Sequence, residues 1–427
     1  MSTACKLPTD SADMRAAPSC KGGRVLVIGD SISLAHVGRA MVAARLLESA
    51  GCKVTFATGP THQALARQEG FEPCEIDCVP PERAIAAIRR GSHIFDLETI
   101  DRYVAADLAL IEDVAPDWIV ADFRLSLNIS CELARMPYWN ILNGYMTHYY
   151  SAPQEPPQTF PLTRLLGLRL TRRFFPALKR QALRYYAYHF NRSRTRRGLK
   201  LAGDILQVME SPHGNLIADL PEFIPCANLP QHFRYIGPLI WEPNVPEPEW
   251  LDRLDAERPC VYATMGSTGE GGMFRRALDA LAEAGYQVLT TTAGQVEDLP
   301  RGVFAAKYAP GSALARRSVA TVCHGGSLTI YQSLAEGVPV VAIPTFHDQE
   351  TNAERLTASG LGAALHPRRW TAEDLVAAVG RAQQDQSRDR CLHAEAQIRE
   401  MQSRQGQSIL SFAPERATYG PRQRDHE

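Results

Sequence analysis

Several features that would mark a particular class of protein are missing from this sequence. None of its 427 residues belongs to an apolar run of about 18 residues, so we expect no membrane-spanning helix. The opening stretch, MSTACKLPTDSADMRAAPSCKGG, has no apolar core of the kind that a secretory signal requires, and we expect a cytoplasmic protein. The formal net charge of −1 gives no indication of nucleic-acid binding.

Cysteine is present, but not in a metal-binding pattern. The ten cysteines are scattered and no C-x-x-C pair occurs. The nearest pair, Cys74 and Cys78, has no matching second pair or His-x-x-x-His. We therefore expect reduced, buried thiols rather than a structural zinc site.

What the sequence does contain is a repeated alternation of apolar strands and amphipathic helices. RVLVIG (24–29) predicts a buried strand, and Val37, Met41, Ala44 and Leu47 follow on one face of a helix. KVTFATG, APDWIVAD and YWNILNG continue the strands in the first half, and PCVYATMGS, YQVLTTTAG, VFAAKYAP, VATVCHGG and VPVVAIP in the second. Strand–helix alternation favours parallel sheets, so we predict two doubly wound, Rossmann-like α/β domains facing a cleft.

Changes in composition mark the expected domain boundaries. GPLIWEPNVPEPEW holds four prolines, which disfavour helix and stiffen the chain, and it predicts a linker. The last helix is expected from about Arg388 to Arg404, and the polar end after it should be frayed. The predicted parts are a disordered segment at 1–22, an N-terminal domain at 23–240, a linker at 241–250, a second domain at 251–404 and a tail at 405–427.

One segment, CHGGSLTIYQSLAEGVPVVAIPTFHDQ (323–349), concentrates groups suited to phosphate and sugar. A predicted strand ends before His324 and a helix begins at Ser327, and ligands of open α/β sheets bind beyond such strand ends. The free N–H groups of a helix N-terminus favour anions. After the next strand, Asp348 and Gln349 can accept from and donate to sugar hydroxyls. The segment predicts a nucleotide-sugar site, although H-G-G or Gly-Val-Pro alone is an ordinary turn.

In this order, the residues resemble the donor-binding signature of family-1 glycosyltransferases of the GT-B fold, and most closely the bacterial macrolide-type and natural-product branch. The resemblance extends over residues 24–413, at motif level outside this segment. It implies an inverting enzyme that uses a nucleotide sugar, most often UDP-linked, and needs no cofactor. No Asp-x-Asp triplet occurs, so no metal–diphosphate clamp is indicated. The matching residues are His324, Gly325, Gly326, Thr329, Gly337, Val338, Pro339, Asp348, Gln349, Asn352 and Ala353.

Two positions in the segment depart from the family pattern. The glutamate expected eight residues after His324, which binds ribose hydroxyls in the family, is Gln332, and an amide can still form hydrogen bonds but without a charge. The asparagine expected four residues after the histidine is Leu328, so one phosphate contact is missing. The helix N-terminus, His324 and the Ser327 hydroxyl would stabilise the departing diphosphate in place of a metal.

The opposite wall of the donor site is assigned by the same resemblance. Gly266 and Ser267, at the end of VYATMGS, would meet the diphosphate, or form an ordinary strand-end turn. In KYAPG, Tyr308 and the backbone of Ala309 would contact the base, and Gly311 stands where a glutamine is usual.

The candidate base follows the first strand. The stretch SISLAHVGRAM resembles the G-H-x-x-P position of the family, with Arg39 where proline is usual, and this makes His36 the general base. Asp122, at the end of the strand WIVAD, is the expected carboxylate partner, and Asp30 and Asp117 compete for that role. By position alone, His36 could be a polar residue at a helix N-terminus and Asp122 a helix cap.

A basic segment lies within the predicted first domain. Residues 156–203 contain neither Asp nor Glu, and twelve Lys or Arg lie between Arg164 and Lys200, mixed with Leu, Phe and Tyr. Such a stretch suits an anionic membrane surface or an acidic acceptor, or is simply a solvated helix face. Peripheral membrane contact through 164–200 is therefore an open prediction.

The sequence thus predicts transfer of a hexose to a hydroxyl of a small-molecule, natural-product or lipid-like acceptor. The alternatives are a nucleotide-sugar epimerase on the same fold and a non-catalytic homologue that assists a partner transferase. The Asp-Gln and Asn-Ala ending of the segment argues against an epimerase. An intact His36–Asp122 pair argues against a non-catalytic homologue, but Gln332 and Leu328 keep that alternative open.

Overall fold

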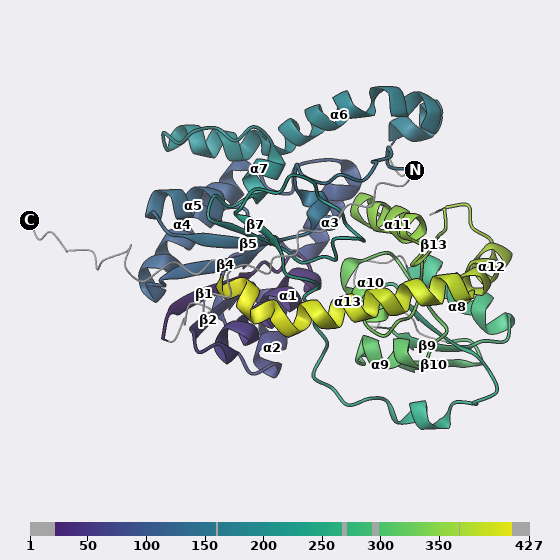
Figure 1. Ribbon diagram of the computed structural model, residues 1–427. Coiled ribbons are helices and arrows are strands. Elements are labelled where there is room, and N and C mark those ends of the chain that lie inside the picture. The colour runs from purple at the N-terminus through teal and green to yellow at the C-terminus, as the bar shows by residue number, and fades with distance from the viewer. Residues whose placement is uncertain (1–21, 159–160, 267–270, 293–298, 367, 412–427) are drawn as a thin grey trace, which may run out of the picture.

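Two parallel α/β domains make up the computed structural model (Figure 1). The prediction of two doubly wound domains is therefore confirmed. The described residues are 22–158, 161–266, 271–292, 299–366 and 368–411.

The first domain is a seven-stranded parallel sheet with strand order β3-β2-β1-β4-β5-β6-β7. The chain runs outward from β1 on one side and then restarts with β4 on the other, and ligand crevices form where the order reverses in this way. The strands are β1 (Arg24–Gly29), β2 (Lys53–Thr58), β3 (Cys74–Glu75), β4 (Trp118–Asp122), β5 (Tyr138–Leu142), β6 (Gly214–Ile217) and β7 (Phe233–Tyr235). The helices are α1 (Leu34–Ser49), α2 (Pro60–Gln68), α3 (Pro81–Arg90), α4 (Leu97–Val114), α5 (Leu127–Ala134), the short 3-10 helix η1 (Gly144–Met146), α6 (Pro161–Arg196) and α7 (Ile205–Met209).

The second domain repeats this plan with a six-stranded sheet of order β10-β9-β8-β11-β12-β13, reversed between β8 and β11. Its strands are β8 (Cys260–Thr264), β9 (Gln287–Thr291), β10 (Val303–Ala306), β11 (Ala320–Cys323), β12 (Val340–Ala342) and β13 (Gly362–Ala364). Its helices are η2 (Glu249–Arg253), α8 (Gly271–Glu283), α9 (Gly311–Arg316), α10 (Ser327–Leu334), α11 (His347–Ser359), α12 (Ala372–Ala382) and α13 (Asp385–Leu410).

Every strand predicted from an apolar run is present, and the four residues predicted for the inner face of α1 are buried. The strands without a prediction are β3, β6, β7 and β13. Each has two to four residues, which is too short for a periodic pattern to stand out.

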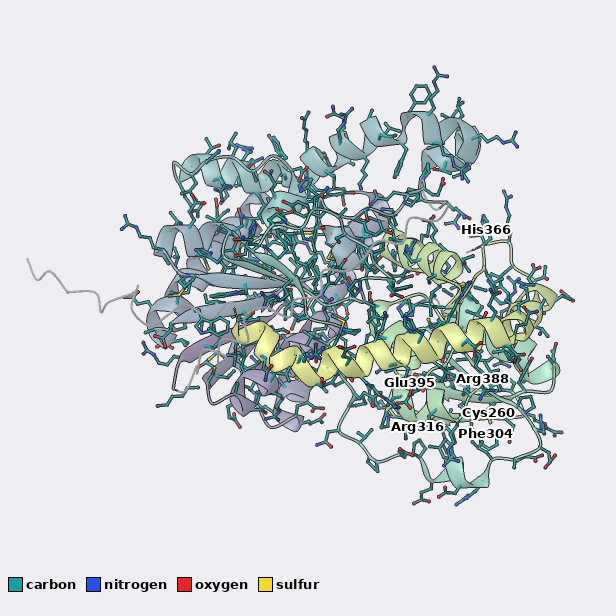
Figure 2. The ribbon with its side chains drawn as sticks, viewed as in Figure 1. Cys260, Phe304, Arg316, His366, Arg388 and Glu395 are labelled. Atoms are coloured by element: carbon teal, nitrogen blue, oxygen red, sulfur yellow. The ribbon has the colours of Figure 1, made fainter. Side chains whose placement is uncertain are left out.

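The proline-rich linker has no helix or strand from residue 236 to 248. Trp241 is buried in the core of the first domain, so the linker is attached to that domain. At its other end, Trp250 packs against Phe304 of β10, with ring centroids 5.7 Å apart, and donates a hydrogen bond to the carbonyl of Ala305 (Figure 2). Both ends of the linker are thus fixed by tryptophans.

The last helix is longer than predicted. Helix α13 starts on the second domain and crosses to the first, where Ile409 and Leu410 join the core (Figure 1). Gln405 donates to the carbonyl of Pro238 at 2.7 Å. The expected start of a tail at residue 405 is therefore wrong, because residues 405–410 are helical and packed; residues 412–427 and 1–21 lie outside the described ranges.

Candidate active site

The predicted base and its carboxylate meet at the carboxyl edge of the first sheet. Strands β1 and β4 are parallel neighbours, with Gly29 opposite Asp122. His36 lies in the first turn of α1, directly after β1. Its Nδ1 is 2.7 Å from Oδ1 of Asp122, so adjacent strand ends bring together two residues that are 86 positions apart.

Arg39 holds the same carboxylate from the other side. Its Nε donates to Oδ2 of Asp122 at 2.7 Å and its Nη2 to Oδ1 at 2.8 Å. Burial of Asp122 favours its neutral form, but Arg39 and then His36 outweigh burial and hold its pKa below the usual value. Asp122 is therefore ionised at neutral pH and accepts a hydrogen bond from the protonated Nδ1 of His36. In this tautomer of the neutral imidazole, Nε2 carries no proton and can act as a base.

The imidazole is also held by stacking. The ring of Phe123 lies 4.5 Å from that of His36, at an interplanar angle of 17°. Phe123 has φ 62, a left-handed conformation that costs a non-glycine residue free energy. The strained residue directly after Asp122 thus supplies the ring that stacks on His36.

The two competing carboxylates have other partners. Asp117 precedes β4, at the opposite end from the candidate site, and accepts from the backbone N–H of Arg24 at 2.7 Å. Asp30 accepts from the backbone N–H of Ile32 and from Arg124, and its burial raises its pKa. Of the three carboxylates, Asp122 is the one hydrogen-bonded to His36.

In the second domain, β11 ends at Cys323 and the predicted H-G-G turn leads into α10. Gly325 has φ +89, which favours glycine, and a Cβ there would lie 3.0 Å from the carbonyl of Gln349. The His324 ring packs against Gly266 and Gly326, so closely that a Cβ at Gly326 would be 2.6 Å from Nε2. The glycines are thus needed for the close approach of the imidazole to the backbone.

His324 is buried and its Nδ1 has no hydrogen-bond partner among the described residues. Burial lowers its pKa to about 4, so the ring is neutral at pH 7. A neutral imidazole carries one N–H, and a phosphate oxygen is an acceptor that would satisfy it.

Residues near the start of α10 contact the neighbouring elements. Asn352 of α11 donates to the carbonyl of Gly325 at 2.9 Å and to Oγ of Ser327 at 3.2 Å. Burial and the nearby charge of Asp348 raise the pKa of Tyr145, on η1 of the first domain, while Ser327 lowers it. The start of α10 therefore faces both the first domain and α11. Thr329, also predicted as a donor contact, is buried in the first turn of α10.

Of the Asp-Gln pair, one residue faces the cleft and one does not. The Asp348 side chain is accessible to solvent, but many protein atoms lie around it. The resulting loss of hydration raises its pKa, and the nearby His36 lowers it. Asp348, on the second domain, thus lies near enough to His36, on the first, for the two groups to interact. Gln349 is buried, and its Oε1 accepts from the backbone N–H and hydroxyl of Thr345 and from the N–H of Phe346, so it holds the start of α11.

The two departures from the family pattern both have partners in the structure. Gln332 donates to the carbonyl of Trp241 at 3.1 Å, and a Cβ at Gly311 would lie 2.6 Å from its Oε1. Glycine at 311 therefore makes room for the Gln332 amide, which ties α10 to the linker. Leu328 packs against the core of the first domain, so this position makes an apolar contact between the domains.

The remaining donor-site predictions lie on the opposite wall. Tyr308 is 56% exposed, which leaves its ring free for stacking, whereas Ala309 is buried. Ser267 lies outside the described residues.

Sequence reasoning missed a buried polar chain that joins the base to α10. Arg39 donates to Oδ1 of Asn143 at 2.8 Å, and Asn143 donates to Asp219 at 3.0 Å. Asp219 also accepts from the hydroxyl of Tyr331, on α10, at 2.8 Å. Asn143 and Asp219 follow the ends of β5 and β6, so the strand-end rule that found Asp122 could have found both.

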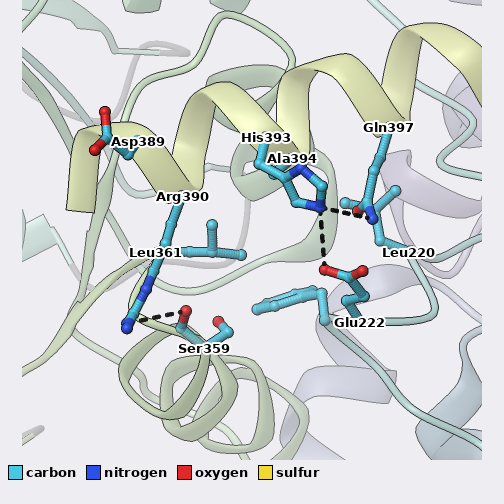
Figure 3. Close-up of a pocket in the computed structure, with 10 residues that line it drawn as sticks. Leu220, Glu222, Ser359, Leu361, Asp389, Arg390, His393, Ala394 and Gln397 are labelled. Atoms are coloured by element: carbon cyan, nitrogen blue, oxygen red, sulfur yellow. Dashed lines mark hydrogen bonds and ion pairs between the residues drawn. The ribbon is translucent and has the colours of Figure 1, made fainter. Parts of the chain in front are cut away.

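The described residues contain no group of three or more His, Cys, Asp or Glu arranged to hold a metal ion, and no helix long and apolar enough to cross a bilayer. A hollow of about 350 Å³ lies beside α13, lined by Leu220, Glu222, Leu361, His393 and Gln397 among others (Figure 3). None of the described residues predicted for catalysis or donor binding lines this hollow, so the candidate site is the cleft.

Comparison with known proteins agrees with this geometry. The sequence profile of the family "UDP-glucoronosyl and UDP-glucosyl transferase" matches residues 257–395. A PGL/p-HBAD biosynthesis glycosyltransferase of Mycobacterium tuberculosis is 36% identical over 365 residues, which is 85% of each chain.

Two solved structures share the fold. The glycotransferase of kitacinnamycin has a TM-score of 0.69 at 20% identity, covering 92% of this chain and 100% of that one. The glycosyltransferase VinC, solved in complex with DTDP, has a TM-score of 0.64 at 18% identity, covering 91% and 99%.

Proposed function

This chain belongs to the family-1 glycosyltransferases of the GT-B fold, and on that premise we propose that it transfers a hexose from a nucleoside-diphosphate sugar to a hydroxyl group with inversion. The observation that carries the proposal is the 2.7 Å contact between His36 and Asp122 on the cleft wall opposite Asp348. A base on one wall and a sugar-binding carboxylate on the other suit a single displacement.

In the proposed reaction, Nε2 of His36 removes the proton of the acceptor hydroxyl while the hydroxyl oxygen bonds to the anomeric carbon. The bond between that carbon and the diphosphate oxygen breaks, and its electron pair leaves with the diphosphate. Asp122 keeps Nδ1 protonated and stabilises the imidazolium that forms. One displacement from the face opposite the leaving group inverts the anomeric carbon.

For the donor, we propose the N-terminus of α10 and the unpartnered His324 as the diphosphate site. The free N–H groups at the helix start and a neutral imidazole N–H are donors for phosphate oxygens, and no metal enters the scheme. Asp348 would bind the sugar hydroxyls and Tyr308 the base. A solved neighbour that holds DTDP supports a nucleoside diphosphate of this type and leaves open whether the base is uracil or thymine.

For the acceptor, the 36% identical relative is the main guide. Its name places it in PGL/p-HBAD biosynthesis. Among the small-molecule, natural-product and lipid-like compounds that the sequence leaves open, this favours an acceptor that is an intermediate of such a biosynthesis. Closure of the two domains would exclude water and limit hydrolysis of the donor.

The test is direct assay of the purified protein. UDP-hexoses and dTDP-hexoses are supplied with candidate acceptors, hexose adducts are measured by mass spectrometry, and the anomeric configuration is read by NMR. We expect His36→Ala to lower the rate about 10²–10⁴-fold, because it removes a positioned base. Its affinity for UDP, measured by calorimetry, should stay close to that of the wild type.

Each alternative gives a different result. Turnover close to normal in His36→Ala would remove His36 from the mechanism. Interconversion of nucleotide sugars without an acceptor would instead indicate an epimerase. Activity that appears only when a second transferase is added would indicate an auxiliary protein.

A further inference from the structure

The outward face of α6 is unusually apolar for a surface helix. Leu170, Phe174, Tyr185 and Tyr188 are 48%, 50%, 46% and 51% exposed. Helical geometry resumes after Gly167, where φ is 77. At about 100° per residue these four side chains fall within an arc of roughly 60°, opposite the face that packs on the domain. They form an outward stripe in which Pro176 lies between the first pair and the two tyrosines, whose ring centroids are 4.0 and 6.4 Å from that of His93.

A row of arginines runs beside this stripe. Arg169, Arg173, Arg180 and Arg184 are exposed and occupy the adjoining arc of roughly 60°. The helix carries no acidic residue to neutralise them. The row extends over roughly 22 Å of helix, which makes a long ridge rather than a converging pocket.

The structure separates these arginines from basic residues with a local role. Arg172 pairs with Glu155, and Lys179 donates to Gln154, so both hold the loop before α6. The pKa of Lys179 is lowered by burial, unlike that of a surface cation. The four arginines of the row thus carry outward basic charge, as does Arg192, whose guanidinium lies 5.9 Å from the ring centroid of Tyr188.

The same helix lies next to the mouth of the cleft. Burial lowers the pKa of His347, the first residue of α11, to about 4, and the nearby charge of Lys179 acts in the same direction. The loop before α6 is bound to α11 as well, since the backbone N–H of Gln158 donates to Glu350 at 2.6 Å. Figure 1 shows α6 lying over α11, which carries Asp348.

We propose that this face of α6 binds the surface of an anionic lipid membrane and brings the cleft mouth to it. The arginine row would meet lipid phosphates and the apolar stripe would enter the headgroup region. An extended, convex strip fits a surface better than a small acidic ligand, which needs converging groups. The inference goes beyond the proposed function, because binding to lipid requires no sugar donor.

The test is co-sedimentation of the full chain with vesicles of phosphatidylcholine alone or mixed with phosphatidylglycerol. We expect binding to the mixed vesicles at low salt, and partial loss at high salt as charges are screened. Each arginine near an anionic surface contributes roughly fivefold to binding. Changing Arg169, Arg173, Arg180 and Arg184 to Gln should therefore weaken partitioning by several hundredfold.

Two further variants separate charge from apolar insertion and from general charge loss. Leu170→Gln with Phe174→Gln should remove the part of binding that survives high salt. A control with the same change in net charge replaces exposed arginines away from α6, namely Arg301, Arg368, Arg388 and Arg404, and should bind like the wild type. Circular dichroism and turnover of a small soluble acceptor should be unchanged in all three, which excludes unfolding.

Absence of binding by the wild type to anionic vesicles at low salt would overturn the proposal. So would equal binding by the α6 quadruple variant and the control. If the α6 variant lost a protein partner while vesicles were ignored, the face would be a protein interface instead. None of these outcomes depends on glycosyl transfer, so failure here leaves the proposed function standing.

Discussion

Replacing Asp122 by asparagine should expose an unusual feature of this site, the cation next to the base. Nη2 of Arg39 lies 3.4 Å from Nδ1 of His36. In the wild type, the Asp122 carboxylate lies between the two groups and compensates the charge of both. In Asp122→Asn, a proton taken up by His36 would face Arg39 without that compensation.

The size of the effect follows from the distance. Two unit charges 3.4 Å apart repel by about 5 kcal/mol at an effective dielectric constant of 20. Proton transfer is incomplete in the transition state, so only part of this repulsion acts there, and we expect a loss of about 10²–10³-fold in kcat, or about 2.7–4 kcal/mol. Loss of the buried partner of Arg39 should also destabilise the fold by about 3 kcal/mol.

A double-mutant cycle distinguishes this explanation from simple misfolding. Turnover, UDP affinity by calorimetry and the free energy of unfolding in urea are measured for Asp122→Asn, Arg39→Gln and the double variant. Removing Arg39 as well should restore part of the lost rate, because the uncompensated cation is gone. Asp117→Asn, at the other end of β4, is the matched control and should be neutral.

The reasoning is refuted if Asp122→Asn keeps its rate within a few-fold while folded. It is also refuted if the double variant is slower than Asp122→Asn, since the repulsion would then not be the cause.

Two further predictions concern His324. His324→Ala removes a donor aimed at the diphosphate and should weaken UDP binding by about 1.5–3 kcal/mol in calorimetry; an unchanged affinity would leave the H-G-G turn with a structural role alone. Burial lowers the pKa of His324 to about 4, so between pH 6.5 and 4 the unfolded chain binds a proton that the folded chain does not. The contribution of the neutral, buried His324 to the free energy of unfolding is complete above about pH 6.5. It is lost as the pH falls toward 4, by up to about 3 kcal/mol. Urea unfolding should show this slope in the wild type and a flatter profile in His324→Gln.

The sequence by itself determined that the chain has two parallel α/β domains, and it made Asp122 the expected partner of His36, with Asp30 and Asp117 as competitors. Apolar strands followed by amphipathic helices force parallel pairing, and parallel pairing puts the carboxyl ends of neighbouring strands on one edge. A polar residue directly after a strand is thus placed without knowledge of side-chain packing. The same rule locates the turn at His324 and the start of α10.

Only the tertiary structure decided which groups those residues contact. Arg39 stands where the family has proline, and nothing in its neighbours along the chain predicts a bidentate contact with a carboxylate 83 positions away. Gln349 matches the family pattern and Gln332 stands in place of a glutamate, yet the Gln332 amide binds the linker and the Gln349 amide binds the start of α11. Hydrogen-bond partners depend on which side chains are brought together in space, and local sequence does not encode them.

The basic segment shows the same division. Its composition indicated a charged and apolar surface, but Arg172 and Lys179 turned out to hold a nearby loop, whereas Arg173 and Arg180 face outward. The sequence determines which residues lie on the same side of the helix, and the packing of α6 on the domain decides which side is buried. A helix shows solvent the face that its neighbours leave uncovered, and those neighbours come from distant parts of the chain.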